Sequence, residues 1–324
     1  MRRMTLLLAL LGLVAALWGV TQYRAAQRVA AIEAMYPPEG EIVTIDGRNV
    51  HVVVKGSGPD LVLIHGAGGN ARDFTYKFAD LLADRYRVFS VDRPGLGYTD
   101  RARPGLDGAF TADAESPIEQ AKLLAAATRA LGAENPIVLG HSFGGAVAMA
   151  WGLEEPTAGL VILSGASMPW PGELRPYYRV FGSPLGSGLG GPLVAAFVSE
   201  SRVRASLPGV FAPAPVDPDY YEGAAVPLAV RTATFRANAR QVNTLRPHLV
   251  KMADRYPDLD LPVEVLHGTE DDTVRTEIHA EPLVATLPNA VLTVLDGAGH
   301  APHHVTPKPV IDAIDRVAER AGLR

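Results

Sequence analysis

The segment Ile137–Gly145 reads IVLGHSFGG, and it decides the fold that we predict for this chain. It begins with a short apolar run, which is typical of a buried parallel strand, and a helical pattern follows over Gly144–Leu153. Between the two, Gly140 and Gly144 flank Ser142. Because neither glycine has a Cβ, the chain can turn sharply from strand to helix without a clash. We therefore predict that Ser142 lies on this turn, with its hydroxyl exposed at the sheet edge beside the helix N-terminus.

The same kind of apolar run recurs on both sides of this segment. Two runs joined by Asp46-Gly47 predict a hairpin, and five more predict buried strands; together they are Glu41–Ile45, Val50–Lys55, Leu61–Ile64, Arg87–Val91, Leu160–Leu163, Val263–Leu266 and Val291–Leu295. Helical patterns lie between several of them, at Phe74–Asp84, Pro117–Leu131 and Pro307–Ala321. Alternation of this kind predicts an α/β fold: a mostly parallel, doubly wound sheet of about eight strands with helices on both faces.

One long segment, from about Pro169 to Asp260, interrupts the alternation. It has no run typical of a buried strand, but it contains helical patterns such as Ala224–Leu245 and many aromatic residues. We interpret residues 169–260 as a helical cap insertion that packs over the carboxyl edge of the sheet and shapes a substrate pocket. The alternative is a set of ordinary surface helices that close the fold. Most of the aromatic side chains are expected to be packing residues.

The N-terminus has a different character. Arg2 and Arg3 precede Met4–Tyr23, which contains no charged residue and is long enough as a helix to span about 30 Å. We predict an uncleaved single-pass transmembrane helix, with the N-terminus in the cytoplasm and the rest of the chain exported to the periplasmic or extracellular side. Arg24 and Arg28 on the other flank weigh against this orientation. The alternatives are secretion after cleavage of a signal peptide, or a helix of the core or the interface.

The anchor is expected to continue as a helix over Gln22–Met35 and to end at Pro37-Pro38. This divides the chain into residues 1–38, the membrane anchor and linker, and residues 39–324, the globular domain. The 324 residues carry a net charge of −5, which argues against nucleic acid as a partner, and the membrane is the partner expected through the first helix. The chain has no cysteine, which excludes disulfides, thiolate metal sites and a cysteine nucleophile.

A serine hydroxyl needs a base within hydrogen-bond reach, and the base needs a group that orients it. His300 directly follows the last predicted strand, among small residues that leave room for an imidazole; His303 and His304 are rivals. The acid is expected after the strand that ends at Leu266. Of the three adjacent acids there, we choose Asp271, so that Glu270 and Asp272 are expected to be solvated loop charges.

Backbone N–H groups are expected to stabilise the negative charge that develops when the serine attacks. One should come from Phe143, which follows the nucleophile. The other should come from the glycine-rich loop after the strand Leu61–Ile64, where Ala67 is the first choice and Gly68 the second. His65 and His141, close to these donors, are expected to have structural roles.

These features together resemble the α/β-hydrolase family, in particular its esterase, lipase and haloperoxidase-like branch. The resemblance extends from about Glu41 to the C-terminus and rests on five motifs: HGAGG at His65–Gly69, DRPGLGYTD at Asp92–Asp100, GHSFGG at Gly140–Gly145, HGTEDDTV at His267–Val274 and GAGH at Gly297–His300. In the family the acid stands three residues after the glycine of the HG pair, which here is Asp271. The resemblance also implies a variable cap, the chain order Ser142, Asp271, His300, and neither a metal nor an organic cofactor.

The resemblance leads to a hypothesis for the activity. Ser142 would attack a carboxylic ester, small or lipid-like, and form an acyl-enzyme that is hydrolysed by water activated at His300. Family members that open epoxides or remove halides use a carboxylate where this chain has Ser142, which makes both reactions improbable. Hydrolysis of carbon–carbon bonds, or acyl transfer with the same triad, remains an alternative. A more remote alternative is a non-catalytic member that binds a ligand.

Overall fold

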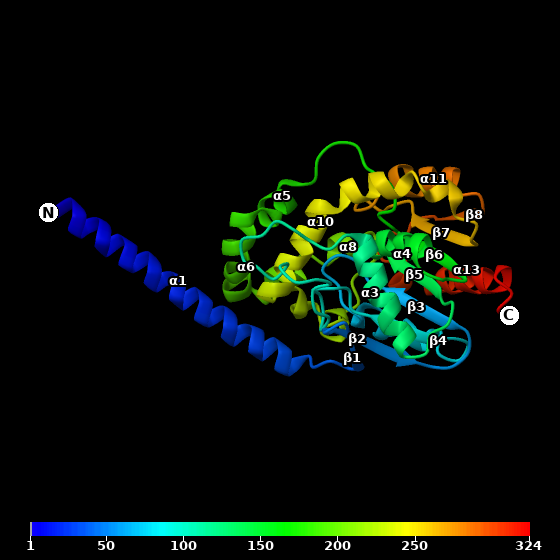
Figure 1. Ribbon diagram of the computed structural model, residues 1–324, viewed down its shortest axis with the longest axis horizontal. Coiled ribbons are helices and arrows are strands. Elements are labelled where there is room, and N and C mark those ends of the chain that lie inside the picture. The colour runs from blue at the N-terminus through cyan, green and yellow to red at the C-terminus, as the bar shows by residue number, and fades with distance from the viewer. Residues whose placement is uncertain (1) are drawn as a thin grey trace.

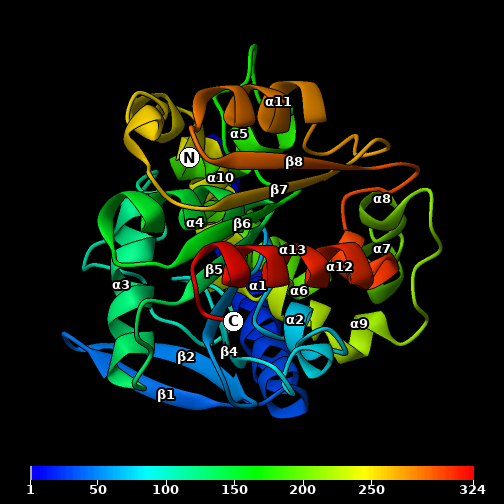
Figure 2. The same ribbon diagram turned by 90° about the vertical axis from the view of Figure 1, so that its right-hand side faces the viewer.

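The computed structural model describes residues 2–324. Eight strands form one sheet, and their bounds lie within two residues of the predicted ones: β1 Glu41–Ile45, β2 Arg48–Lys55, β3 Asp60–Ile64, β4 Arg87–Val91, β5 Ile137–His141, β6 Gly159–Leu163, β7 Val263–Gly268 and β8 Ala290–Leu295. Their order in the sheet is β1-β2-β4-β3-β5-β6-β7-β8. The strands β1 and β2 are antiparallel to their neighbours, and β3 to β8 are parallel. Figure 2 shows the sheet from β1 to β8. The predicted α/β class and the mostly parallel sheet are confirmed.

Helices cover both faces of the sheet and divide the core in two. On one face α3 (Pro117–Ala130), α4 (Phe143–Glu154) and α11 (Thr276–Thr286) bury their apolar side chains against the strands. On the other face α13 (Pro307–Arg320) and the short helices after β3 do the same. The helix α3 begins at a capping box, in which Ser116 and Glu119 each bond the other's backbone N–H, with Pro117 in the first turn. The sequence pattern predicted α3, α4 and α13 within one residue at each end.

One predicted helix is broken in two. The apolar pattern over Phe74–Asp84 forms only α2 (Arg72–Thr75) and the 3₁₀ helix η1 (Ala79–Leu81). Between them Lys77 has a left-handed backbone with φ of 73°, which interrupts the helix. Phe74, Phe78 and Leu82 are nevertheless all buried, because the break still directs them into the core.

Between β6 and β7 the chain leaves the sheet and forms a group of helices, which we call the cap. Its members are α5 (Pro176–Gly182), α6 (Pro184–Phe197), α7 (Glu200–Arg204), α8 (Pro208–Phe211), α9 (Tyr220–Gly223), η2 (Val226–Val230), α10 (Thr232–Ala253) and η3 (Tyr256–Asp258). The helix predicted over Ala224–Leu245 was placed too early. Ala225 has a φ of 48° and Pro227 follows in a 3₁₀ turn, so the long helix α10 begins only at Thr232.

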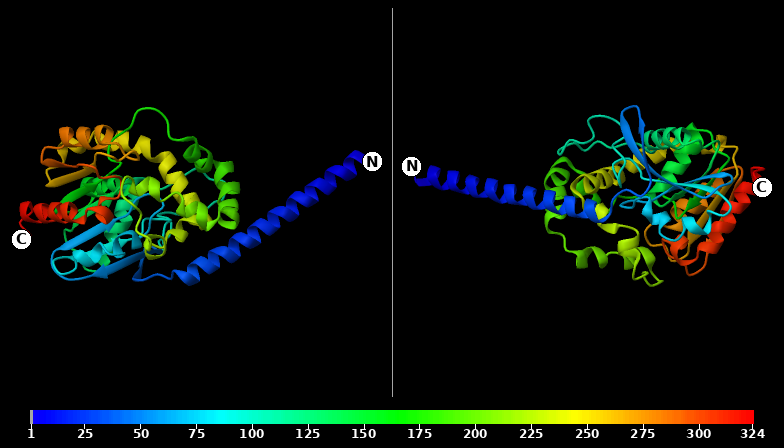
Figure 3. Two further views of the ribbon diagram at one scale, coloured as in Figure 1. Left: turned by 180° about the vertical axis from the view of Figure 1, so that it is seen from behind. Right: turned by 90° about the horizontal axis from the view of Figure 1, so that it is seen from below.

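The first helix, α1 (Arg2–Met35), is long and apolar enough to cross a membrane. Its first half stands away from the domain, as Figures 1 and 3 show, with large apolar side chains exposed from Met4 to Val20. Its second half packs against the cap and buries Thr21, Ala25 and Ile32. The second half of the helix therefore packs against the domain, whereas the apolar side chains of its first half are exposed. The division of the chain at residue 38 stays a prediction.

Candidate active site

Ser142 lies on a strained turn between β5 and α4. Its φ of 54° and ψ of −119° lie in a region that residues other than glycine rarely adopt. The turn is possible because its neighbours are glycines: a Cβ on Gly140 would lie 2.1 Å from the carbonyl oxygen of Gly144, and one on Gly144 would lie 2.2 Å from that of Ile64. The turn raises the serine above the carboxyl ends of the central strands, at the start of α4.

The structure brings Ser142, His300 and Asp271 into one chain of hydrogen bonds. Ser142 Oγ lies 2.9 Å from His300 Nε2, and His300 Nδ1 lies 2.8 Å from Asp271 Oδ2. A carboxylate can only accept, so Nδ1 carries the proton and Nε2 offers its lone pair to the serine hydroxyl. All three residues are buried, and they follow three strands that end at the same edge of the sheet, β5, β7 and β8. The distances fit a nucleophile, a base and an orienting acid.

The backbone after β7 holds the carboxylate of Asp271 in place. Its Oδ1 accepts hydrogen bonds from the N–H groups of Thr273 and Val274, each at 2.9 Å. Burial alone would raise the pKa of Asp271, but the hydrogen bonds from His300 and Val274 outweigh it and lower that pKa. The other two acids, Glu270 and Asp272, are exposed, as the sequence analysis expected of them.

Two backbone N–H groups next to Ser142 are free to bind an oxyanion. Within residues 2–324, the amides of Ala67 and Phe143 donate to no other group. The amide of Gly68, our second choice, instead donates to Asn238 Oδ1 of α10 at 2.7 Å. This contact engages Gly68 and ties the loop to the cap. The geometry therefore favours Ala67 and Phe143 as the donors, although their catalytic role stays a prediction.

His65 and Arg93 support this loop from below. His65 Nε2 accepts from the backbone N–H of Arg93 at 3.0 Å, so its Nδ1–H donates to the carbonyl of Gly66 at 2.9 Å. Burial, with the charge of Arg93, lowers the pKa of His65 to about 4. The guanidinium of Arg93 also donates to the carbonyl of Gly66 and lies 3.9 Å from the ring centre of Phe143. Burial lowers the pKa of Arg93 to about 9.

A second cluster of polar side chains lies beside the candidate triad. His141 Nε2 donates to the carbonyl of His300 at 2.8 Å. Nearby, the carboxylate of Asp73 accepts from Tyr220 Oη at 2.7 Å and from His304 Nε2 at 3.0 Å. Burial alone would raise the pKa of Asp73, but the surrounding histidines hold it well below its usual range. Sequence reasoning assigned no role to Asp73.

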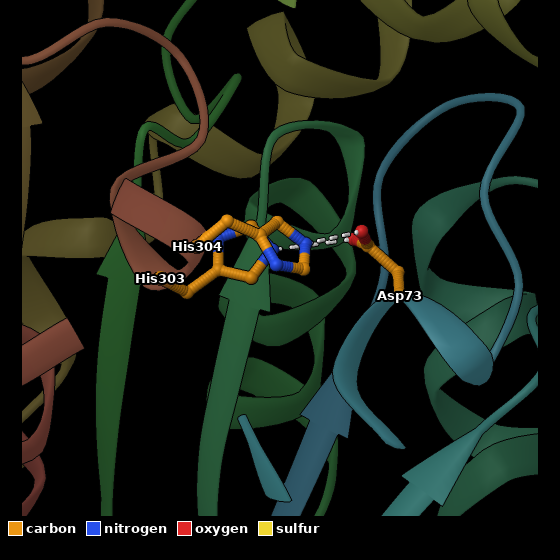
Figure 4. Close-up of side chains that lie close together, drawn as sticks. All are labelled: Asp73, His303 and His304. Atoms are coloured by element: carbon orange, nitrogen blue, oxygen red, sulfur yellow. Dashed lines mark hydrogen bonds and ion pairs between the residues drawn. The ribbon is translucent and has the colours of Figure 1, made fainter. Parts of the chain in front are cut away.

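Figure 4 shows Asp73 facing His303 and His304 of α12 (Pro302–Val305). The atoms that could bind a metal ion, one from each residue, lie within 4.8 Å of one another. Tyr220 and His304 both donate to Asp73 Oδ1, while the two ring nitrogens of buried His303 have no hydrogen-bond partner among the described residues; its Nε2 lies 3.5 Å from Asp73 Oδ2. The expectation that no metal or organic cofactor takes part stays a prediction.

Two cavities meet at Ser142. The smaller, of about 220 Å³, is lined by His300, by polar side chains such as Asp73 and Tyr220, and by apolar ones such as Leu207 and Val210. The larger, of about 290 Å³, extends past Phe143 to apolar residues that include Trp170, Leu174, Val242 and Leu245, and it is also lined by the charged residues Glu173, Arg175, Asp272 and Arg275. Ala67, Ser142, Tyr178 and Thr273 line both cavities. The nucleophile therefore stands where two cavities join, each lined by both apolar and polar side chains.

Three residues that contribute to this arrangement were missed from the sequence: Arg93, Asp73 and Asn238. A signal existed for Arg93, because it stands at the start of the motif Asp92–Asp100, directly after β4. No local pattern marks Asn238, whose contact with Gly68 joins residues 170 positions apart.

Curated proteins similar in sequence cover most of this chain. An uncharacterized protein of Mycobacterium tuberculosis (strain ATCC 25618 / H37Rv) is 28% identical over 298 residues, which are 86% of this chain and 81% of that protein. A protein of the same strain named haloalkane dehalogenase 2 is 25% identical over 294 residues, 86% of this chain and 95% of that one.

Among solved structures, a bacterial membrane phospholipase A matches with a TM-score of 0.65 and 22% identity, covering 99% of both chains. At this level of identity the match is evidence of a shared fold. The family model described as the alpha/beta hydrolase family matches residues 61–313, which contain every residue of the candidate site. The chain therefore belongs to the alpha/beta hydrolase family and is a hydrolase.

Proposed function

We propose that this hydrolase cleaves a carboxylic ester through an acyl-enzyme formed on Ser142. The observation that carries the proposal is the unbroken chain of hydrogen bonds from Ser142 Oγ through His300 to Asp271 Oδ2. His300 takes the hydroxyl proton as the serine attacks, and Asp271 stabilises the imidazolium that results. The amides of Ala67 and Phe143 donate to the oxyanion. His300 then gives the proton to the leaving alcohol and activates water for the second step.

The two cavities support an assignment of the two halves of the ester. The alcohol must leave beside His300, which protonates it, and of the two cavities His300 lines only the smaller. The acyl group then extends past Phe143 into the larger cavity, where Trp170, Val242 and Leu245 offer it apolar contacts. We therefore propose an ester whose apolar acyl chain occupies the larger cavity and whose alcohol occupies the smaller, either a small molecule or lipid-like.

The identity of the nucleophile, Ser142, also distinguishes among the alternative reactions. One relative is named a haloalkane dehalogenase, but family members with that activity carry a carboxylate at the position of Ser142, so we do not propose dehalogenation. Hydrolysis of a carbon–carbon bond and acyl transfer can use the same triad, and they remain the second candidates. The non-catalytic alternative is disfavoured because the hydrogen-bonded triad geometry has no use in a protein that only binds.

We further propose that α1 stays attached as a single-pass membrane anchor and that the domain lies on the exported side. The exposed apolar surface of its first half, and a fold match to a membrane phospholipase A that spans the whole chain, support this. If the helix is instead a cleaved signal, the mature protein will lack it, and mass spectrometry of the protein from its native host will show the shorter chain.

The test of the proposed function uses the full chain in detergent with p-nitrophenyl esters of graded acyl length. We expect turnover by the wild type and none above background for Ser142→Ala. If the wild type hydrolyses none of the esters and does not react with a fluorophosphonate probe, the proposal is contradicted. Reaction with the probe without ester turnover would favour acyl transfer or a carbon–carbon substrate.

A further inference from the structure

The cap helix α6 has an apolar face that the described part of the chain leaves largely uncovered; at its end the Arg24 guanidinium lies 5.0 Å from the ring centre of Phe197. Leu185, Leu189, Leu193 and Phe197 are 69%, 44%, 44% and 52% exposed. A spacing of four residues places them in one stripe along the helix. Val180 and Tyr177 of the neighbouring helix α5 extend the stripe, at 55% and 49% exposure. We call these six residues the α5–α6 face.

Apart from Tyr177, whose ring packs edge-on against Phe181 and Phe235, and Phe197, the side chains of the α5–α6 face take little part in building the domain. The opposite side of α6 makes the contacts with the protein: Gly188, Gly191 and Ala195 are buried there, and Arg236 of α10 donates to the backbone carbonyls of Ser187 and Gly188. The helix contains no charged residue over its whole length. Exposed apolar patches of this kind are unusual on soluble proteins and mark a surface that binds something.

The position of the face suggests what covers it. Ala25 of α1 packs against Ala195 and Ala196 of α6, and Arg28 donates to the carbonyl of Val198. The exposed apolar half of α1 begins directly beyond this contact. Figures 1 and 3 show α5 and α6 on the side of the domain from which α1 projects, in views from the front, from behind and from below. The two apolar surfaces therefore lie on the same side of the domain, next to the contact between α1 and α6.

We propose that the α5–α6 face inserts into the interface of the membrane that α1 spans, so that the cap rests on the bilayer. Lipid fits this surface better than a second copy of the chain, because the adjoining half of α1 is apolar on all sides rather than along one stripe. Arg24 and Arg28 stand where α1 meets the cap, at the level of the lipid headgroups, where basic side chains are favourable.

Docking of this face would bring the active site to its substrate. Tyr178 of α5 lines both cavities at Ser142, while Tyr177 and Val180 of the same helix belong to the outward face. The helix α5 thus lies between the outward face and the catalytic cavities. The ester is then one that resides in the membrane, with its acyl chain in lipid and its polar end at the surface. This step rests on the proposed anchor and the proposed esterase activity.

The chain has no cysteine, so a single introduced cysteine can carry a fluorescent label without further changes. The full chain would be placed in vesicles of phosphatidylcholine and phosphatidylglycerol in equal parts, with a nitroxide-bearing lipid as quencher. We expect strong quenching at Leu189→Cys and Leu193→Cys. Leu10→Cys, within the proposed span, is the positive control. Val291→Cys, 46% exposed on β8, is the negative control.

Each outcome decides between specific parts of the proposal. Quenching at Leu10→Cys but not at Leu189→Cys or Leu193→Cys would overturn the docking and leave the anchor intact. No quenching at Leu10→Cys would contradict the anchor itself. Quenching between labelled copies, with none by lipid, would identify the face as a contact between two chains and would also overturn the proposal.

A second experiment measures the consequence for turnover. The double variant Leu189→Glu with Leu193→Glu should hydrolyse an ester dispersed in the same vesicles at least about tenfold more slowly than the wild type, because two charges oppose insertion. Its rate on a soluble p-nitrophenyl ester should not change, since neither residue lines a cavity at Ser142. Equal loss on both substrates would indicate a damaged fold and, together with unquenched labels, would count against docking. Absence of turnover by the wild type on both would instead contradict the esterase proposal.

Discussion

The carboxyl edge of the sheet and the cap both surround Ser142, but they hold their residues in different ways. At the sheet edge, backbone groups fix each position: Asp271 accepts from two N–H groups, and Ser142 is bounded by glycines that admit no other residue. The cap contributes mostly apolar side chains from short helices and one long one, α10. The sheet edge therefore fixes the reacting groups, whereas the cap determines the shape of the cavity that receives the substrate. Changes at the sheet edge should therefore affect all substrates alike, whereas changes in the cap should affect the choice among them.

The largest effect is expected at the acid. Asp271→Asn should lower kcat by about 10⁴-fold for every ester, because an amide nitrogen cannot accept from His300 Nδ1 and the imidazole is left in the wrong tautomer. The matched comparison is Asp272→Asn, one residue along the same loop, exposed and lining the larger cavity, which should lower kcat far less than Asp271→Asn does. A greater loss for Asp272→Asn in steady-state assays would show that the acid was misassigned.

A change in the cap should alter selectivity instead. Val242→Trp fills part of the larger cavity and should lower kcat/KM for long acyl esters by about 100-fold, while acetate esters are spared. Val250→Trp, 43% exposed on the same helix, serves as the control. A uniform loss across the chain-length series would contradict the placement of the acyl group in this cavity.

Buried neutral histidines should make the stability of the sheet edge depend on pH. The folded pKa of His65 is lowered to about 4 from an unfolded value near 6.5, so its contribution to stability is present above the unfolded value and is lost as the pH falls toward 4. Between pH 7 and pH 5 this amounts to about 2 kcal/mol. In denaturant titrations His65→Gln should lose less unfolding free energy over this interval than the wild type. An identical loss would show that His65 takes up its proton in the folded protein as well.

The contact that joins the two regions should have the smallest effect. Asn238→Ala removes the acceptor for the Gly68 amide and should lower kcat by about tenfold without altering the chain-length preference, because the loop that carries Ala67 is then less firmly held. Asn243→Ala removes an amide elsewhere on α10 and should leave kcat unchanged. A shift in chain-length preference would mean that Asn238 acts through the shape of the cap.

The sequence predicted the sheet edge far better than the cap, and the reason is physical. Strands, the turn at Ser142 and the order of the three candidate triad residues depend on local patterns, so β4 was predicted residue for residue and Ser142 and His300 were found from their neighbours. The break at Lys77 and the late start of α10 depend on backbone conformations that no apolar periodicity encodes. The contact of Asn238 with Gly68 joins distant segments, and a single sequence carries no signal for it. Arg93 stands in a recognisable motif, but the motif does not indicate that its guanidinium lies over Phe143.

The central claim is that Ser142 is an activated nucleophile, and covalent labelling tests it most directly. The full chain in detergent would be treated with a fluorophosphonate, and the modified residue would be located by mass spectrometry of its peptides. The account predicts one modification, on Ser142, and no labelling of Ser142→Ala. A folded wild-type protein that stays unlabelled, or a variant that is labelled as strongly as the wild type, would contradict it.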